Sequence, residues 1–259
     1  KPGLALATNA LLQHGTSELD EQALAEAFDQ MGMLASHSTS QDHAKVSLRL
    51  LNEDGIKEKA VELLNNLLID PAFPSQGLSR VKSEITARQR AKEESPMHIA
   101  KAAFLKKVYG NSPYGHLAIG NAQSLEKIDQ STVKQFFNQH YNASNAEITL
   151  VGDLSKRQAK RMVEGIFDEV PQGEKKTVQM TLPEQQGGLV HIPYDSTQAS
   201  VIIGQPAMAM NNPDRFALSV ANAVLGNFAM QSRLFTKIRK EEGLAYSVYS
   251  YLGPRAMVG

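Results

Sequence analysis

The chain has 259 residues, which is long for one average domain and sufficient for two, each with its own core. Its 27 Lys and Arg side chains balance 27 Asp and Glu side chains, so the sequence lacks the basic surface that nucleic-acid binding requires. No Cys is present, which excludes disulfides, thiolate metal sites and a cysteine nucleophile. No apolar run approaches the roughly 20 residues of a membrane span, and no signal-peptide pattern opens the chain.

The first predicted element is the apolar helix LATNALLQHGT (residues 6–16), which carries no Asp, Glu, Lys or Arg and ends at Gly15. The next helix, ELDEQALAEAFDQMG (residues 18–32), follows Ser17 and Asp20, whose spacing predicts a capping box. The alternating segments 33–40 and 43–51 then predict an antiparallel pair of strands. Apolar residues at helical spacing in IKEKAVELLNNLLIDP (residues 56–71) predict a helix that Pro71 ends.

Further along the chain, helices are predicted over 76–94, 97–109, 131–141 and 155–167. Residues 109–120 form a glycine-rich loop between them, and AEITLVGDL (residues 146–154) predicts a strand. The loop YGNSPYG lacks the Lys-Ser/Thr of a phosphate-binding loop and follows no strand, so a structural loop is expected. This order of elements indicates an α+β fold.

Residues 171–188 are rich in Pro, Gly and Gln and poor in core residues, which is typical of a linker. We therefore expect an N-terminal domain over 1–170, a linker over 171–188 and the start of a C-terminal domain over 189–259. That last part predicts two strands within 189–205 and a helix within 213–227.

A short internal repeat links the two parts of the chain. ATNALL, at residues 7–12, matches VANAVL, at residues 220–225, and this places Asn9 over Asn222. Two homologous halves are therefore expected. The sequence opens almost inside a helix and ends within a strand pattern, so we also expect it to be a fragment of a longer protein.

Several segments in one order resemble the pitrilysin/insulinase-type zinc metallopeptidases, in the branch related to mitochondrial processing peptidase. They are GLALATNALLQHGT, MGMLASHSTSQDHAKVSLRLL, LLIDPAFPSQGLSRVKSEI, SPYGHLAIG, FFNQHYNASNAEITLVGDL and GNFAMQSRLFTKIRKEEGLAYSVYSY. The resemblance implies two similar α+β halves, each an antiparallel-rich sheet packed with helices, which enclose a chamber. Here the second half is expected to be truncated.

The catalytic motif of that family, His-x-x-Glu-His, falls on Leu6, Asn9 and Ala10 in this chain. Leucine and alanine have no lone pair for zinc, and an amide cannot accept a proton as a carboxylate base does. The third ligand of the family would fall near residues 81–87, where Glu84 is the only carboxylate. We therefore expect no metal site and no catalytic residue at these positions.

The resemblance also implies a substrate-binding pair, Arg239 and Tyr246, within RKEEGLAY. In the family this pair approaches the scissile peptide, where a guanidinium and a phenol can donate hydrogen bonds to a developing oxyanion. A surface contact is the alternative for both residues. For Arg233, Tyr249 and Tyr251 we expect packing or a place in a peptide groove.

The histidines show no pattern of ligand spacing. His37 and His43 flank the expected hairpin turn and are able to meet across it, but no third ligand accompanies them. His14, in the last turn of the opening helix, is expected to interact with the helix dipole. No zinc site is predicted from the remaining histidines, which are His98, His116, His140 and His191.

Two hypotheses of different class remain. In the first, the chain is a non-catalytic subunit of a heterodimeric zinc endopeptidase and supplies chamber wall and the Arg239/Tyr246 pair to peptide hydrolysis. In the second, it is a peptide-binding or assembly subunit with no part in catalysis. The expected partner is a zinc-bearing sibling, or else a second copy in a homodimer, with peptides as substrates and zinc on the partner. Periplasm or cell envelope is the expected location, with cytoplasm as the alternative.

Overall fold

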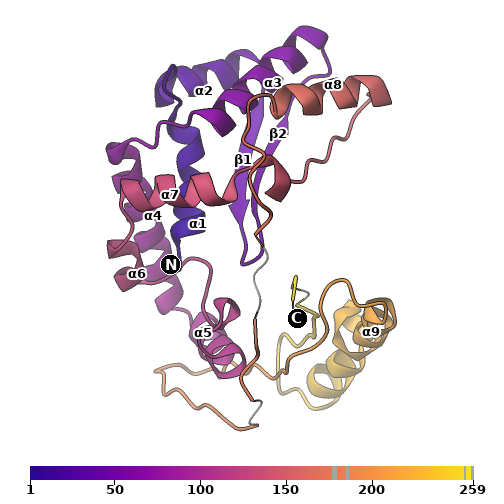
Figure 1. Cartoon of the computed structure of the whole chain (residues 1–259). Coiled ribbons are helices and arrows are strands. Elements are labelled where there is room, and N and C mark those ends of the chain that lie inside the picture. Colours follow the sequence, from indigo (N-terminus) through magenta and orange to yellow (C-terminus); the bar gives the residue numbers. More distant parts are fainter. Residues whose placement is uncertain (177–179, 185–186, 254, 258–259) are drawn as a thin grey trace. The chain divides into compact units, whose positions relative to one another are not determined.

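The computed structural model describes residues 1–176, 180–184, 187–253 and 255–257 (Figure 1). The chain divides into two compact units, Lys1–Val178 with Gln186–Val201 and Gln179–Gln185 with Ile202–Gly259. The expected linker, residues 171–188, includes 177–179 and 185–186, which lie outside the described residues. The expected domain boundary therefore stays a prediction.

The first unit is built mainly of helices, with one β-hairpin. Its helices are α1 (Leu4–Leu11), α2 (Glu21–Gln30), α3 (Asp54–Ile69), α4 (Ser75–Glu93), α5 (Pro96–Tyr109), α6 (Ala122–Glu126), α7 (Gln130–His140) and α8 (Lys156–Ile166), with 3₁₀ turns η1 (Leu12–His14), η2 (Pro113–Gly115) and η3 (Ala143–Asn145). The hairpin strands are β1 (Leu34–Thr39) and β2 (Ala44–Arg49). The fold is thus α+β, as expected, and helix-rich.

The helix starts follow from side chains that accept the otherwise unpaired N–H groups of the first turn. Asp129 accepts from the Thr132 N–H at 2.8 Å to start α7. Asp20 does the same for α2, accepting from the Ala23 N–H. The predicted capping box of Ser17 and Asp20 is therefore wrong. Asp20 itself is the N-cap residue, and α2 begins at the next residue, Glu21.

The hairpin is antiparallel, with Thr39 opposite Ala44 and Leu34 opposite Arg49. Ser40 closes its turn, since its N–H donates to the His43 carbonyl at 2.8 Å and its hydroxyl accepts from the N–H groups of the turn. The turn lies where the sequence predicts it, around Gln41 and Asp42.

Helix α1 lies at the centre of the largest core. It contacts α4, α7 and both strands of the hairpin, as Figure 1 shows for the α1, α4 and α7 ribbons. The buried members of this core are Leu4, Ala7, Leu11, Leu12, Phe73, Leu78, Val81, Ile85, Ile119, Leu125, Ile128, Val133 and Phe137. A second core joins α2 and α3 through Leu24, Met31, Met33, Ala60, Leu63 and Leu67. The apolar opening of the sequence is therefore the scaffold around which the unit packs.

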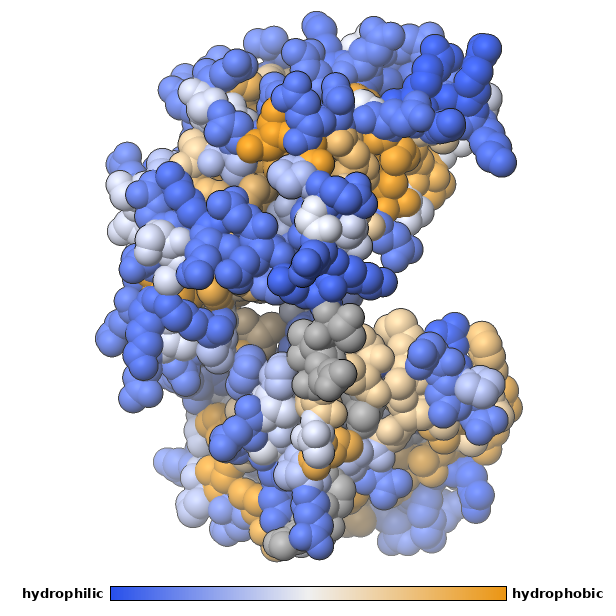
Figure 2. Space-filling view, in the orientation of Figure 1, coloured by the Kyte–Doolittle hydropathy of each residue, from blue (hydrophilic) through white to orange (hydrophobic). Residues whose placement is uncertain are grey.

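The second unit contains α9 (Arg215–Asn222), which continues into a π-helical turn, η4 (Ala223–Asn227). After a 3₁₀ turn, η5 (Ala229–Gln231), comes a second π-helical segment, η6 (Phe235–Glu241). The residues of α9 that match α1 in the repeat are less covered than their counterparts, because Val220 is 68% exposed whereas Ala7 is 0% exposed. Apolar surface is visible in the space-filling view (Figure 2).

The strands predicted within 146–154 and 189–205 form no hydrogen-bonded ladder, although both ranges are described. Val151, Leu189 and Ile203 are each more than nine-tenths exposed. An alternating pattern predicts a half-buried strand only where a neighbouring strand exists. Within the described residues, no helix combines the length and the apolar character needed to cross a bilayer.

Candidate functional site

The three positions that correspond to the zinc motif lie on α1. Leu6 and Ala10 are partly buried and pack against the main core, where neither offers a metal ligand. Asn9 is completely buried. These positions therefore do not fit zinc, and the buried amide is the polar group that remains.

The amide of Asn9 connects α1 to the hairpin. Its Nδ2 lies 3.0 Å from the Ser38 carbonyl oxygen, 3.2 Å from the Lys45 carbonyl oxygen and 3.3 Å from the Thr39 hydroxyl oxygen. Its Oδ1 accepts a hydrogen bond from the Tyr141 hydroxyl at 3.3 Å. Three acceptors on one side and a donor on the other define the orientation of the amide. A carboxylate, which only accepts, would keep the Tyr141 donor but would face the Ser38 and Lys45 carbonyl oxygens without a hydrogen to donate.

Tyr141 closes the site from the end of α7. Its ring stacks on Phe137, with centroids 4.7 Å apart, and Phe137 in turn packs edge-on against Phe73. Burial raises the pKa of the Tyr141 hydroxyl well above its usual value. The phenol therefore stays protonated and serves as the donor to Asn9 throughout the physiological range.

His14 lies at the C-terminal end of this helical segment. Its Nδ1 lies 3.0 Å from Glu21 Oε2, and Arg80 from α4 contacts both His14 and Glu21. These contacts form a network between η1, α2 and α4, and the expected interaction of His14 with the helix dipole stays a prediction. This network is structural, because it holds three elements together and leaves His14 largely buried.

His37 and His43 do not pair with each other. His43 Nδ1 lies 3.0 Å from the Ser40 hydroxyl within the turn. His37 lies on β1, where burial and then the charge of Arg88 lower its pKa, so it is neutral near pH 7.

Glu84, the remaining carboxylate of the expected ligand set, is exposed on α4 and lies 3.8 Å from Arg88. Among the described residues, no three His, Asp or Glu side chains are grouped to hold a metal ion.

The second unit brings the expected pair together. Arg239 lies on η6, and the chain then turns at Gly243, whose φ of +65° favours glycine. The Leu244 N–H donates back to the Ile238 carbonyl at 3.0 Å. This turn brings Tyr246 over Arg239, with the guanidinium carbon 4.5 Å from the ring centroid.

A second ring, whose role was not predicted from the sequence, contacts the same guanidinium. Arg239 Cζ lies 5.0 Å from the ring centroid of Phe235, four residues earlier in η6. The i, i+4 spacing of an aromatic residue and an arginine was the available signal. Arg239 is therefore placed by two cation–π contacts.

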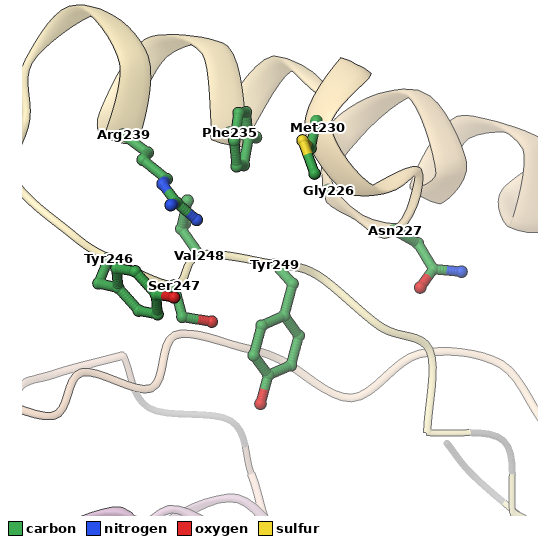
Figure 3. Close-up of a pocket in the computed structure, with 9 residues that line it drawn as sticks. All are labelled: Gly226, Asn227, Met230, Phe235, Arg239, Tyr246, Ser247, Val248 and Tyr249. Atoms are coloured by element: carbon green, nitrogen blue, oxygen red, sulfur yellow. The ribbon is translucent and has the colours of Figure 1, made fainter.

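These residues line a hollow of about 320 Å³ within the second unit (Figure 3). Its lining comprises Gly226, Asn227, Met230, Phe235, Arg239, Tyr246, Ser247, Val248 and Tyr249. Tyr249, expected in packing or a groove, thus belongs to the hollow. The ring of Tyr251 lies 6.2 Å from that of Tyr249 and is not in the lining. Arg233 is absent from it as well.

Two family models match the chain. The model for insulinase (peptidase family M16) matches residues 1–120, and the model for the peptidase M16 inactive domain matches residues 127–258. The chain belongs to peptidase family M16. The expected resemblance is thereby confirmed, and the M16 inactive-domain match covers the hollow around Arg239.

Curated M16 relatives are similar over nearly the whole chain. A protein of Helicobacter pylori named "Non-peptidase homolog YmxG" is 29% identical over 95% of this chain and 57% of its own length. An "Uncharacterized zinc protease YmxG" of Bacillus subtilis is 27% identical over 92% of this chain and 57% of its own length. The chain thus spans somewhat more than half the length of the relatives it matches.

Solved M16 structures share the fold. The crystal structure of a peptidase M16 inactive domain from Pseudomonas fluorescens superposes with a TM-score of 0.91 at 30% identity, over 99% of this chain and 63% of that one. A protease from Helicobacter pylori gives a TM-score of 0.83 at 19% identity, over the same shares. The chain therefore has the fold of these structures, and residues 127–258 match the M16 inactive domain.

Proposed function

We propose that this chain serves as a non-catalytic subunit of a heterodimeric M16 zinc endopeptidase. In this proposal it contributes chamber wall and the Arg239/Tyr246 pair, while a sibling subunit carries zinc and the catalytic base. The observation that carries the proposal is the contrast between the two units. The motif positions on α1 hold no ligand or base, whereas Arg239 and Tyr246 lie in contact beside a hollow.

The geometry of Arg239 supports a role toward peptide. Both ring contacts use the faces of Phe235 and Tyr246, and the Tyr246 side chain is exposed. Donors that point at the carbonyl of a scissile peptide stabilise the negative charge that develops there. A guanidinium does this at every physiological pH, because it does not deprotonate.

The hairpin offers a way to hold an extended peptide. Within the described residues, β1 and β2 pair only with each other, so each strand keeps an outer edge. A peptide that adds to such an edge is held by main-chain hydrogen bonds, which accept varied sequences.

The test combines this chain with a sibling subunit that has an intact His-x-x-Glu-His motif and measures peptide cleavage and bound zinc. Neither activity nor stoichiometric zinc is expected from this chain alone. Arg239→Ala is expected to lower the rate of the pair by about 100-fold, since removal of one oxyanion donor costs that order. Tyr246→Phe is expected to lower it by about 10-fold, the size of one net hydrogen bond. Arg215→Ala is the matched control, because Arg215 also lies over a ring, that of Phe216, but outside the hollow.

Cleavage by this chain alone, with zinc retained after dialysis, would refute the proposal. Full activity of both variants in the pair would instead favour the assembly function. The H. pylori relative is named a non-peptidase homologue, and that name is compatible with the assembly function. We further propose a periplasmic or envelope location, which cell fractionation with an antibody against the chain tests directly.

A further inference from the structure

The hollow in the second unit is lined by apolar side chains and by one positive charge. Met230, Phe235, Val248 and Tyr249 supply its apolar wall, and Arg239 is its only charged residue. In Figure 3 the Arg239 side chain extends from its helix toward Tyr246 and Ser247. A ligand that fills this space therefore meets hydrocarbon and one cation.

Arg239 has no acidic partner in the part of the chain that the structure describes. The nearest candidates in sequence, Glu241 and Glu242, both pair with Lys237, each at 3.0 Å. Its guanidinium contacts two rings, and among the described residues no hydrogen-bond acceptor accompanies its N–H groups. Arg215 differs, because its Nη1 donates to the Met210 carbonyl at 3.0 Å.

A guanidinium that contacts two rings and has no acidic partner among the described residues suits one ligand chemistry in particular. The planar fork of N–H donors matches the two oxygens of a carboxylate, and such charge-assisted pairs are about twice as strong as neutral hydrogen bonds. A peptide carbonyl offers a single oxygen without charge. The unneutralised cation therefore favours a carboxylate, as it favours a developing oxyanion, over a neutral carbonyl.

The size of the hollow limits what accompanies the carboxylate. Ligand sites in proteins span roughly 300–1,000 Å³, and this hollow of about 320 Å³ lies at the lower end. It accommodates one or two residues of a peptide. The apolar side chains that line the hollow together with Arg239 then select a hydrophobic side chain beside the carboxylate.

We propose that this hollow binds a peptide carboxylate that lies next to an apolar side chain, with Arg239 on the carboxylate and Phe235, Met230 and Tyr249 around the side chain. The inference rests on the proposed peptide-binding function of the same site. The carboxylate comes from the C-terminus of a peptide or from an acidic side chain, and both sources offer the same chemistry to Arg239.

The experiment titrates the whole chain, without sibling and without zinc, with three tripeptides and follows its tyrosine signals by NMR. The first is acetyl-Ala-Ala-Leu with a free C-terminus, the second is its C-terminal amide, and the third is acetyl-Glu-Ala-Leu amide. The free acid is expected to bind at least about 10-fold more tightly than the neutral amide, as one charge-assisted pair implies. The signals that shift are expected to be those of Tyr246 and Tyr249, assigned with Tyr→Phe variants.

The third peptide distinguishes the two sources of the carboxylate. Affinity like that of the free acid assigns the site to acidic side chains as well, and affinity like that of the neutral amide assigns it to C-termini; either result supports a carboxylate site. Arg239→Gln is expected to bring the acid-to-amide ratio to about 1, and Arg239→Lys to an intermediate value, because it keeps the charge without the fork.

Arg215→Gln is the matched control and is expected to keep the preference for the acid. Equal binding of acid and amide by the unmodified chain overturns the inference, as does a preference that persists in Arg239→Gln. Because this assay needs neither sibling nor cleavage, its failure leaves the proposed function intact if Arg239→Ala still slows the zinc-bearing pair.

Discussion

Replacement of the buried Asn9 is expected to destabilise the first unit more than any surface substitution on the same helices. Asn9→Ala removes the donors to the Ser38 and Lys45 carbonyls and the acceptor for the Tyr141 hydroxyl. Each net hydrogen bond contributes about 1 kcal/mol, and each buried group left without a partner costs about 1–3 kcal/mol. Because the amide nitrogen carries two hydrogens, it makes at most two of its donor bonds at a time. The free energy of unfolding is therefore expected to fall by about 2–4 kcal/mol.

The assay is urea unfolding of the chain, followed by circular dichroism, which reports mainly on the first unit because α1 to α8 lie there. Asn138→Ala is the matched control, since Asn138 is exposed on α7. It is expected to change the free energy of unfolding by no more than about 0.5 kcal/mol. A loss for Asn9→Ala as small as for this control would refute the hydrogen-bond argument.

A second substitution at the same position separates hydrogen bonding from packing. Asn9→Asp keeps the shape but places a carboxylate oxygen against the Ser38 and Lys45 carbonyl oxygens, which only accept. An unpaired buried charge is more costly than a missing neutral bond, so at pH 7 this variant is expected to be less stable than Asn9→Ala. Because its ionised form is the unfavourable one, the loss is expected to grow as the pH rises above about 4, where the unfolded carboxyl ionises. Equal stability of Asn9→Asp and the unmodified chain at pH 7 would contradict the assignment of donors and acceptors.

Two further predictions concern the scaffold. Gly115→Ala is expected to destabilise the chain by about 1–3 kcal/mol, because the added Cβ would lie 2.0 Å from the Gly110 carbonyl oxygen. Gly55→Ala in α3, where nothing lies within 4 Å, is expected to stabilise by up to about 1 kcal/mol; thermal melts compare the two. The pKa of Asp129 is lowered to about 2 by the hydrogen bonds from Thr132 and Ser131, so its stabilising contribution is present above about pH 4 and lost as the pH falls toward about 2. Asp129→Asn is expected to weaken the pH dependence of the urea midpoint in that window, and an unchanged dependence would contradict it.

The helices and the hairpin were largely predictable because their signals are local. Apolar spacing gives α2 and α3, and the alternation on either side of Gln41 and Asp42 gives β1 and β2 in the observed register. Helix α5 begins at Pro96, a residue favoured at this position of a helix. The strands expected in 146–154 and 189–205 failed for a non-local reason. An alternating pattern indicates which side chains of a segment share a face, but it does not indicate whether a partner strand is present.

Some features of the candidate site were likewise predictable from the sequence, and others were not. That Leu6 and Ala10 offer no ligand follows from side-chain chemistry alone. The contacts of Asn9 did not follow, because its acceptors lie 29 and 36 residues away on two strands and no local pattern announces them. Phe235 was open to prediction, since it precedes Arg239 by one helical turn. The roles of Arg239 and Tyr246 stay predictions until the assays proposed above are made.

The hydrogen bonds of Asn9 make the absence of a catalytic base hard to reverse. A single change to glutamate would lengthen the side chain and set its carboxylate against the Ser38 and Lys45 carbonyls, at a position that is completely buried. The hairpin would have to move away from α1 before a carboxylate there was relieved of those two carbonyl oxygens. Two histidines added at positions 6 and 10 would not relieve that conflict, because it arises between α1 and the strands. A metal site with a carboxylate base on α1 would therefore require a changed backbone as well as changed side chains.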